Sequence, residues 1–280
     1  MKTYLDCIPC FFRQGLEAAR MVTQNEVTQK KVLVKIAEVI PKFSLNSTPP
    51  EMGRIIHRIV RQLTGSTDPY REIKKQHNKI ALKLYPELKK KIVKAKDSLF
   101  LAIKIATAGN VVDLGVKSTI NIKDEIEKIF HQDFAIFDYA RFKKILKEVD
   151  QILYIGDNAG EIVFDRLLIE NFKKKVTYVV RDKPIINDAT LDDAFFCGMD
   201  EVARIISSGC DAPGIVLKDC SDEFLDHYKK AELIISKGQG NYESLSDVQK
   251  PIFFLLKAKC PVVARDLGCR VGDIVLKGSV

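Results

Sequence analysis

Acidic and amide side chains follow a short apolar run near the middle of the chain. Residues 152–155 are apolar, and residues 156–161 (Gly-Asp-Asn-Ala-Gly-Glu) lead from them into a stretch with helical spacing. In open α/β sheets, ligands bind beyond the carboxyl ends of strands, and a helix amino end there presents unpaired N–H groups to phosphate. Asp157 and Asn158 carry the hard oxygen atoms that divalent cations prefer. The loop predicts a metal and phosphate site, although Asn158 and Glu161 also match a capping box, which needs no ligand.

Two further polar loops follow later apolar runs. In residues 181–190, Asp188 is a candidate third oxygen ligand, or alternatively the N-cap of the next helix. In residues 236–243 (Ser-Lys-Gly-Gln-Gly-Asn-Tyr-Glu), Lys237 can neutralise phosphate charge and two glycines expose backbone N–H groups, although an ordinary glycine-rich turn has the same composition. We expect all three loops at one rim of a sheet, because the carboxyl ends of parallel strands share an edge.

Two motifs outside these loops allow a functional and a structural interpretation. In residues 109–115, Asn110 can hydrogen-bond a substrate or orient a ligand, but it also suits a helix C-cap. Cys7 and Cys10 share one face of a helix start. They supply half of a four-ligand zinc site, and no second pair follows. Two small buried cysteines are the alternative.

The elements that must position these loops fall into two regions. Up to about residue 105, apolar residues recur at helical spacing, and Asp68 with Pro69 predicts a helix start. After about residue 146, short β-branched runs alternate with amphipathic stretches, which is typical of a largely parallel sheet covered on both faces. The predicted strands are 152–155, 176–180, 202–206, 233–235 and 261–264. We predict a mainly helical cap region at 1–108 and an α/β core at 109–280.

Composition narrows the classes of partner. No apolar run reaches the length of a membrane span, and the first residues do not resemble a secretion signal. Seven scattered cysteines favour a reducing cytoplasm over a disulfide scaffold. The net charge is +8, but the lysines are dispersed, without a basic stripe that includes aromatics. We expect a cytoplasmic protein with a small anionic substrate and neither a nucleic-acid nor a membrane partner; the oligomeric state is left open.

The motifs, in this order and spacing, resemble the damage-control phosphatase family, also called domain of unknown function 89, over nearly the whole chain. The matching segments are 6–10, 109–115, 157–161, 184–188 and 237–243. The resemblance implies a three-layer α/β/α, Rossmann-like core and a metal-dependent phosphoric monoester hydrolase. Its substrates would be small phosphorylated metabolites, including sugar phosphates and damaged or surplus phosphometabolites. The pair Cys7 and Cys10 resembles the CxxC-bearing subfamily I, which is widespread in microbes.

The resemblance also implies roles for individual residues. A divalent ion (Mn, Ni, Co or Mg) would be held at the catalytic centre by Asp157, Asn158 and Asp188, and the nucleophile would be a water molecule or an aspartate. Arg265 lies where the eukaryotic sugar-phosphate subfamily has Arg-Thr-x-Lys, so substrate preference cannot be transferred from that branch. The substrate-binding candidates are Asn110, Asp113, Lys237, Gly238, Gln239, Gly240, Asn241 and Glu243, and the accessory candidates are Cys7, Cys10 and Arg265.

Two rival functions are compatible with the sequence. One is an S-adenosylmethionine-dependent carboxyl methyltransferase, but such enzymes usually carry Gly-x-Gly-x-Gly after the first strand, where this chain places the carboxylate of Asp157. The other is a non-catalytic metal- or thiol-binding module built around Cys7 and Cys10.

Overall fold

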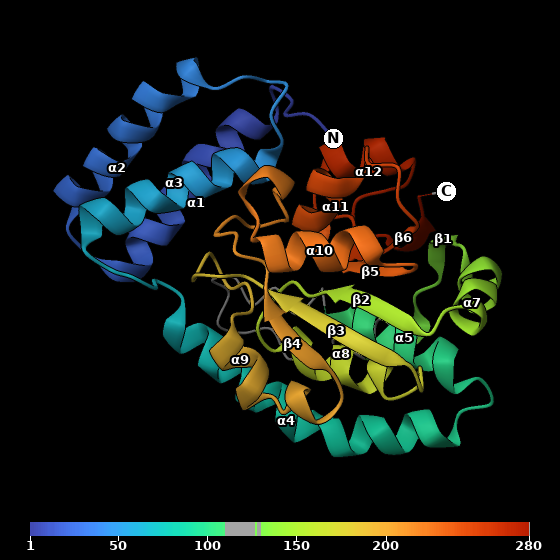
Figure 1. Cartoon of the computed structure of the whole chain (residues 1–280). Coiled ribbons are helices and arrows are strands. Elements are labelled where there is room, and N and C mark those ends of the chain that lie inside the picture. The colour runs from blue at the N-terminus through green and yellow to red at the C-terminus, as the bar shows by residue number, and fades with distance from the viewer. Residues whose placement is uncertain (110–126, 128–129, 280) are drawn as a thin grey trace.

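The computed structural model describes residues 1–109, 127 and 130–279. A group of amino-terminal helices adjoins a seven-stranded sheet that has helices on both faces (Figure 1). The predicted fold class is confirmed: an α/β/α arrangement around a largely parallel sheet, with helices at the amino-terminal side.

The first three helices share a small core of their own. They are α1 (Cys7–Val22), α2 (Glu26–Val39) and α3 (Pro49–Thr64), with a short 3-10 turn, η1 (Ile40–Lys42), after α2. The side chain of Asn25 accepts from two backbone N–H groups at the start of α2. Thr48 and Glu51 form a capping box at the start of α3. The predicted helices in this part of the chain are confirmed.

Two further helices follow this group and cover the sheet. These are α4 (Arg71–Lys94) and α5 (Ser98–Gly109), and both pack on α8 (Glu161–Ile169). The predicted start of α4 is wrong, because Asp68 and Pro69 form a turn before the helix. Asp68 accepts from the Tyr70 N–H at 3.1 Å through Oδ1, so it caps that turn instead of the helix. The division at residue 108 stays a prediction.

The sheet has the order β1-β7-β6-β5-β2-β3-β4. Its strands are β1 (Phe134–Phe137), β2 (Gln151–Ile155), β3 (Lys175–Val180), β4 (Arg204–Ser207), β5 (Ile234–Lys237), β6 (Ile252–Lys257) and β7 (Ile274–Gly278). All neighbouring pairs are parallel except β6 and β7. The predicted run 233–235 overlaps β5, which begins one residue later and extends to Lys237, and β4 begins two residues later than predicted.

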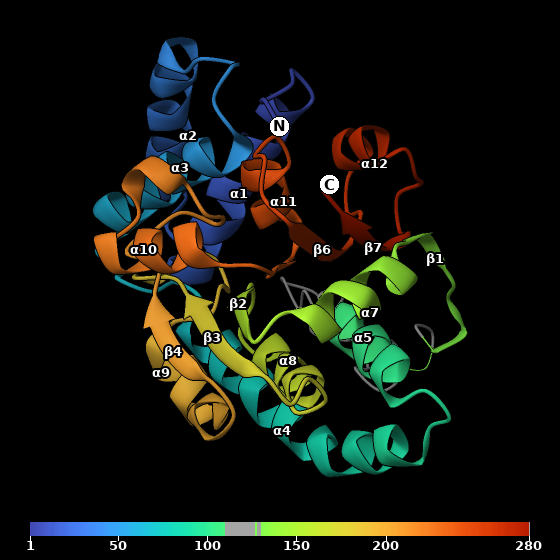
Figure 2. The same ribbon diagram turned by 45° about the vertical axis from the view of Figure 1, so that its right-hand side comes forward.

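Alternate residues of each strand serve the two faces. Tyr154 of β2 packs with α4, α5, α8 and α7 (Tyr139–Glu148), whereas its neighbour Ile155 packs with the opposite layer. That layer consists of α10 (Asp222–Lys230), α11 (Gln239–Leu245) and α12 (Pro261–Leu267). Figure 2 shows the two helical layers on either side of the strands. The remaining elements are α9 (Leu191–Phe196), η2 (Met199–Glu201) and η3 (Leu217–Asp219).

The prediction of a strand at 261–264 is wrong. This segment begins α12, where Pro261 occupies the first turn and the Cys260 Sγ accepts from the Val263 N–H. The adjoining strand, β6, lies earlier at Ile252–Lys257, and it was not predicted from the sequence, nor were β1 and β7. Five consecutive residues of β6 are buried, so the run shows no alternation to distinguish a central strand from a buried helix.

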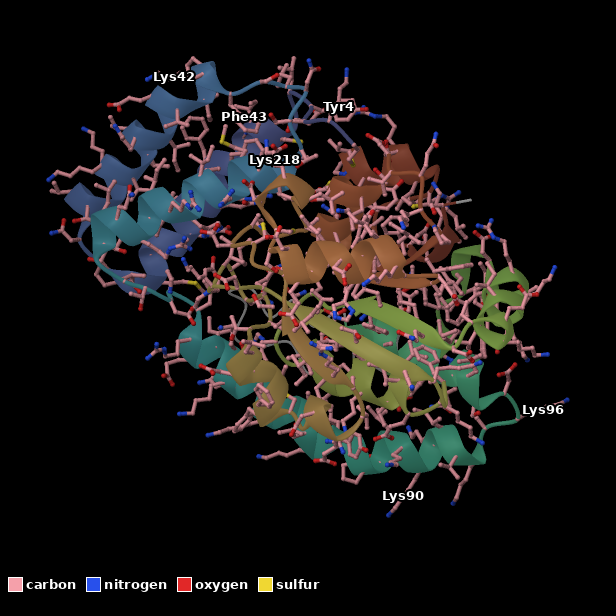
Figure 3. All side chains as sticks on the ribbon, in the orientation of Figure 1. Tyr4, Lys42, Phe43, Lys90, Lys96 and Lys218 are labelled. Atoms are coloured by element: carbon pink, nitrogen blue, oxygen red, sulfur yellow. The ribbon has the colours of Figure 1, made fainter. Side chains whose placement is uncertain are left out.

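Within the described part of the chain, no helix is long and apolar enough to cross a membrane. Lys42, Lys90, Lys96 and Lys218 project from separate parts of the ribbon (Figure 3), in keeping with dispersed positive charge. The expected absence of nucleic-acid binding stays a prediction.

Candidate active site

The three predicted metal ligands meet at the carboxyl ends of β2 and β3. Asp157 and Asn158 directly follow β2, and Asp188 lies in the loop after β3. The backbones of the two loops pair: Ala159 N–H donates to Asn187 O and Ala189 N–H to Asp157 O, both at 2.8 Å. This forms a two-residue antiparallel bridge between Asn158 and Asp188. The main chain therefore sets the spacing of the ligand candidates.

One cavity of about 410 Å³ opens above this bridge. Asp157, Asn158, Asn187 and Asp188 line its inner wall. The rest of the lining comes from the amino-terminal parts of α1, α3, α11 and α12 and from Ile186 and Pro213. The amino-terminal helices thus complete a cavity whose acidic end belongs to the sheet.

The acidic end carries two carboxylates close to a single guanidinium. Arg181, at the end of β3, is 1% exposed. It donates from Nε to Asp188 Oδ2 at 2.7 Å, and its Nη2 lies 3.6 Å from Asp157 Oδ1. Burial raises the pKa of Asp157 well above its usual range, and the charges of Asp188 and Glu161 add to this increase. Two acids held together out of water favour a bound cation, because it would offset their mutual repulsion.

The donor set at this end fits a hard divalent cation. Within the described residues, no group of three His, Cys, Asp or Glu side chains forms a metal site. Two carboxylates with the amide of Asn158 remain, and oxygen ligands of this kind suit Mg²⁺ or Mn²⁺. The Nδ2 of Asn187, in the same wall, is buried and has no hydrogen-bond partner among the described residues. An amide donor there suits a phosphate oxygen better than a metal.

The residues of the predicted substrate loop at the end of β5 lie in different environments. Gln239, Gly240 and Glu243 line the cavity. Gly238 has a φ of 79°, and a Cβ there would collide with Asp157 Oδ2, so this position requires glycine. Asn241 does not line the cavity. It accepts from Arg181 Nη2 and Ile215 N–H and donates to Gly156 O and Lys237 O, which ties neighbouring loops together.

Lys237 lies outside the cavity, contrary to the expectation of direct phosphate contact. It is fully buried, and its Nζ donates to Glu161 Oε1 at 2.5 Å, Asp165 Oδ1 at 2.6 Å and Ala106 O at 2.9 Å. The reason is the alternation of β5: Lys237 shares the strand face of Ile235, which packs toward α5 and α8. Glu161 in turn accepts from the backbone N–H and the Nδ2 of Asn158.

Two of the three accessory candidates line the cavity and the third does not. Cys7 and Cys10 line the cavity from the first turns of α1, and burial raises the pKa of Cys7. Arg265 does not line it; the guanidinium is 63% exposed and lies 3.8 Å from Asp6, at the outer rim. Asn110 and Asp113 lie outside the described residues.

The polar lining residues that the sequence did not predict include Asn187, Lys259 and Cys260. Lys259 and Cys260 follow β6, the strand that was not predicted, and the charge of Lys259 opposes the rise in the pKa of Asp157. Asn187 directly precedes a predicted ligand, and its position in a loop at a strand end was the available signal. With β6 included, four strand ends contribute to one rim.

These observations define the class of protein: an α/β fold with a cavity of about 410 Å³, lined by acidic and amide side chains, at the carboxyl ends of its strands. The model of the damage-control phosphatase ARMT1-like domain matches residues 3–275. The chain belongs to this family.

Relatives extend over almost the whole chain. An uncharacterised protein of Methanocaldococcus jannaschii is 42% identical, covering 97% of this chain and 93% of its own length. A damage-control phosphatase of Pyrococcus horikoshii is 36% identical, covering 98% and 97%. One of Archaeoglobus fulgidus is also 36% identical, covering 97% of both chains. The crystal structure of a protein of the domain of unknown function 89 family from Pyrococcus horikoshii covers both chains fully, with 35% identity and a TM-score of 0.92.

The family membership confirms the resemblance drawn from the motifs and supports a phosphatase, a hydrolase with a small phosphorylated metabolite as its substrate. It does not favour the methyltransferase. Membership of subfamily I stays a prediction. Cys7 and Cys10, on which the rival thiol module rests, line the same cavity as the acidic residues.

Proposed function

We propose that this chain is a metal-dependent phosphomonoesterase that acts on small metabolites, with sugar phosphates and related damaged or surplus phosphometabolites as its substrate class. The observation that carries the proposal is the convergence of Asp157, Asn158 and Asp188 on one cavity. That cavity is large enough for a small phosphate ester and too small for a polymer.

The chain's own residues account for binding and orientation. Asp157, Asn158 and Asp188 would hold the divalent ion (Mn, Ni, Co or Mg), which supplies positive charge to the phosphate oxygens. Arg181 fixes the Asp188 carboxylate by its 2.7 Å bond. Asn187 and Lys259 line the same cavity, and their side chains are the candidates to bind the remaining phosphate oxygens.

The partial enclosure of the cavity would also limit side reactions. Residues of α1 and α3, including Phe11, Pro49 and Pro50, cover the acidic end from the side opposite the sheet. Their apolar surface reduces the water around the ester, and fewer waters strengthen each charge interaction with the phosphate. The nucleophile would be a water molecule or one of the two aspartates.

The test is a screen of phosphorylated metabolites against Mn²⁺, Ni²⁺, Co²⁺ and Mg²⁺. Asp157→Ala should abolish the metal-dependent turnover of any substrate found. Asp182→Ala is the matched control, because Asp182 lies on the same rim but is exposed and does not line the cavity. Activity that survives in Asp157→Ala would sink the assignment of this site.

A further inference from the structure

We infer that Glu243 is the general acid of the proposed phosphatase and protonates the leaving-group oxygen of the ester. The inference rests on the proposed function. Phosphate monoesters of ordinary alcohols have poor leaving groups, because the departing alkoxide is a strong base. A positioned acid contributes typically 10²- to 10⁴-fold to such a step.

Glu243 lies on α11, the helix that starts beside the acidic end of the cavity. Gly238, just before this helix, abuts the carboxylate of Asp157. A helix rises about 1.5 Å per residue, so Glu243 stands about 7 to 8 Å further along the axis. Gln239 and Glu243 are spaced i, i+4 and face the cavity together. A phosphoryl group held at the acidic end would therefore direct its ester oxygen along α11 toward Glu243.

The surroundings of the Glu243 carboxyl favour its protonated form. Gln239 Nε2 donates to Glu243 Oε1 at 2.9 Å and fixes its rotamer. Burial raises the pKa of Glu243 to about 7, while the bond from Gln239 and the charge of the chain's amino group oppose the rise. An acid of this strength carries its proton near neutral pH and can release it within a turnover.

Other charged groups nearby do not replace this acid. From α3, only Pro49, Pro50 and Gly53 reach the lining, and none of them titrates. The titratable or charged groups around the cavity near Glu243 are the Met1 amino group, which donates to Glu243 O, and the side chains of Asp6, Cys7, Cys10, Arg13, Lys259 and Cys260. The Cys7 and Cys260 thiols have raised pKa values, mainly through burial, and the charge of Glu243 adds to both shifts. Both therefore stay neutral near pH 7.

The step balances as a hydrolysis. A nucleophilic oxygen attacks phosphorus, the bond from phosphorus to the ester oxygen breaks, and its electron pair stays on that oxygen. The Glu243 carboxyl gives its proton to this oxygen, so that the alcohol leaves neutral. One water is consumed in the cycle, which yields inorganic phosphate and returns a proton to Glu243.

The experiment compares two esters on one variant with Mn²⁺ present. Glu243→Gln retains size and the acceptor for Gln239 but has no acidic proton. It should lower kcat for an alkyl phosphate by about 10²- to 10⁴-fold and change kcat for p-nitrophenyl phosphate by no more than about twofold, because a nitrophenolate leaves without protonation. Wild-type kcat on the alkyl ester should fall as pH rises through about 7, and this limb should be absent in the variant.

Glu232→Gln is the control, since Glu232 lies away from the cavity. Equal losses on the two esters would overturn the general-acid role, because a binding or structural defect does not depend on the leaving group. Hydrolysis of both esters by Glu243→Gln at the wild-type rate would overturn it as well. A wild-type protein inactive on both esters with every metal would instead overturn the proposed function, and this inference with it.

Discussion

Two clusters near the carboxyl ends of the strands each contain two carboxylates and one cation, but their surroundings differ. In the buried cluster, Lys237 binds Glu161 and Asp165, and all three side chains have no exposed surface. The hydroxyls of Tyr154 and Tyr178 also donate to Asp165, at 2.7 and 2.8 Å. In the cavity cluster, Arg181 binds Asp188 closely, Asp157 lies farther from it, and both acids face open space.

The difference separates acids that are bound within the protein from acids that line a cavity. A count of charges treats the two clusters as equal. What distinguishes them is that the buried acids are surrounded by short donors from the protein, whereas the cavity acids face a volume that a ligand can enter. Burying charges is tolerated when geometry and hydrogen bonding compensate for lost hydration. Removing the cation of the buried cluster should therefore affect folding, and changing the cavity cluster should affect binding.

The largest effect is expected for Lys237→Met. Two buried carboxylates lose their cation, which should lower the free energy of unfolding by about 3 to 5 kcal/mol. Asp165 already has a pKa raised to about 6 by burial, with Lys237 opposing the rise. Without Lys237 the folded state favours the protonated acid more strongly, so the loss should be greater at pH 8 than at pH 5. Urea denaturation at the two pH values measures this, and an unchanged midpoint at pH 8 would contradict it.

An intermediate effect is expected from metal binding in the cavity cluster. Free Mn²⁺ at 100 times its Kd should raise the free energy of unfolding by about 2.7 kcal/mol, since the ion binds the folded state. Asp188→Asn should lose most of this gain, whereas Asp182→Asn should keep it. Thermal denaturation with Mn²⁺ or with a chelator gives the comparison. Equal stabilisation of both variants would place the ion elsewhere.

The smallest effect is expected for Tyr154→Phe. It removes one buried hydroxyl from Asp165 and leaves the Tyr178 and Lys237 bonds in place. Stability should fall by about 1 kcal/mol, with kcat and the Mn²⁺ affinity unchanged. A large loss of metal affinity in this variant would show that the buried cluster acts on the cavity directly, and the separation of the two clusters would fail.

The sequence predicted the cavity cluster better than the buried one. Asp157, Asn158 and Asp188 were identifiable because polar residues after apolar runs mark strand ends, and strand ends of a parallel sheet share a rim. Lys237 also lies at the end of an apolar run. The layer into which its side chain points depends on the face of the sheet to which the last residue of β5 belongs. A four-residue strand buried on both faces does not decide this.

The other residues were not predicted for a similar reason: a fully buried strand gives no alternating pattern in the sequence. The apolar run of β6 lacks the alternation that marks a half-buried strand, so the predicted sheet did not include it, and Lys259 and Cys260 were not recognised as rim residues. Asn187 adjoins a predicted ligand, but its importance comes from an amide without a partner among the described residues, which only packing reveals. Periodicity predicts layers well; it does not predict which side chains remain unsatisfied.

The main-chain bridge between Asn158 and Asp188 holds the two loops together without help from their side chains. Its two bonds, at 2.8 Å, join backbone atoms of residues 157, 159, 187 and 189 and involve no side chain. New side chains at positions 157, 158 and 188 would therefore stand at the same spacing as the old ones. The loops therefore offer a scaffold for combinatorial redesign, in which three side chains can be changed without rebuilding the backbone that spaces them.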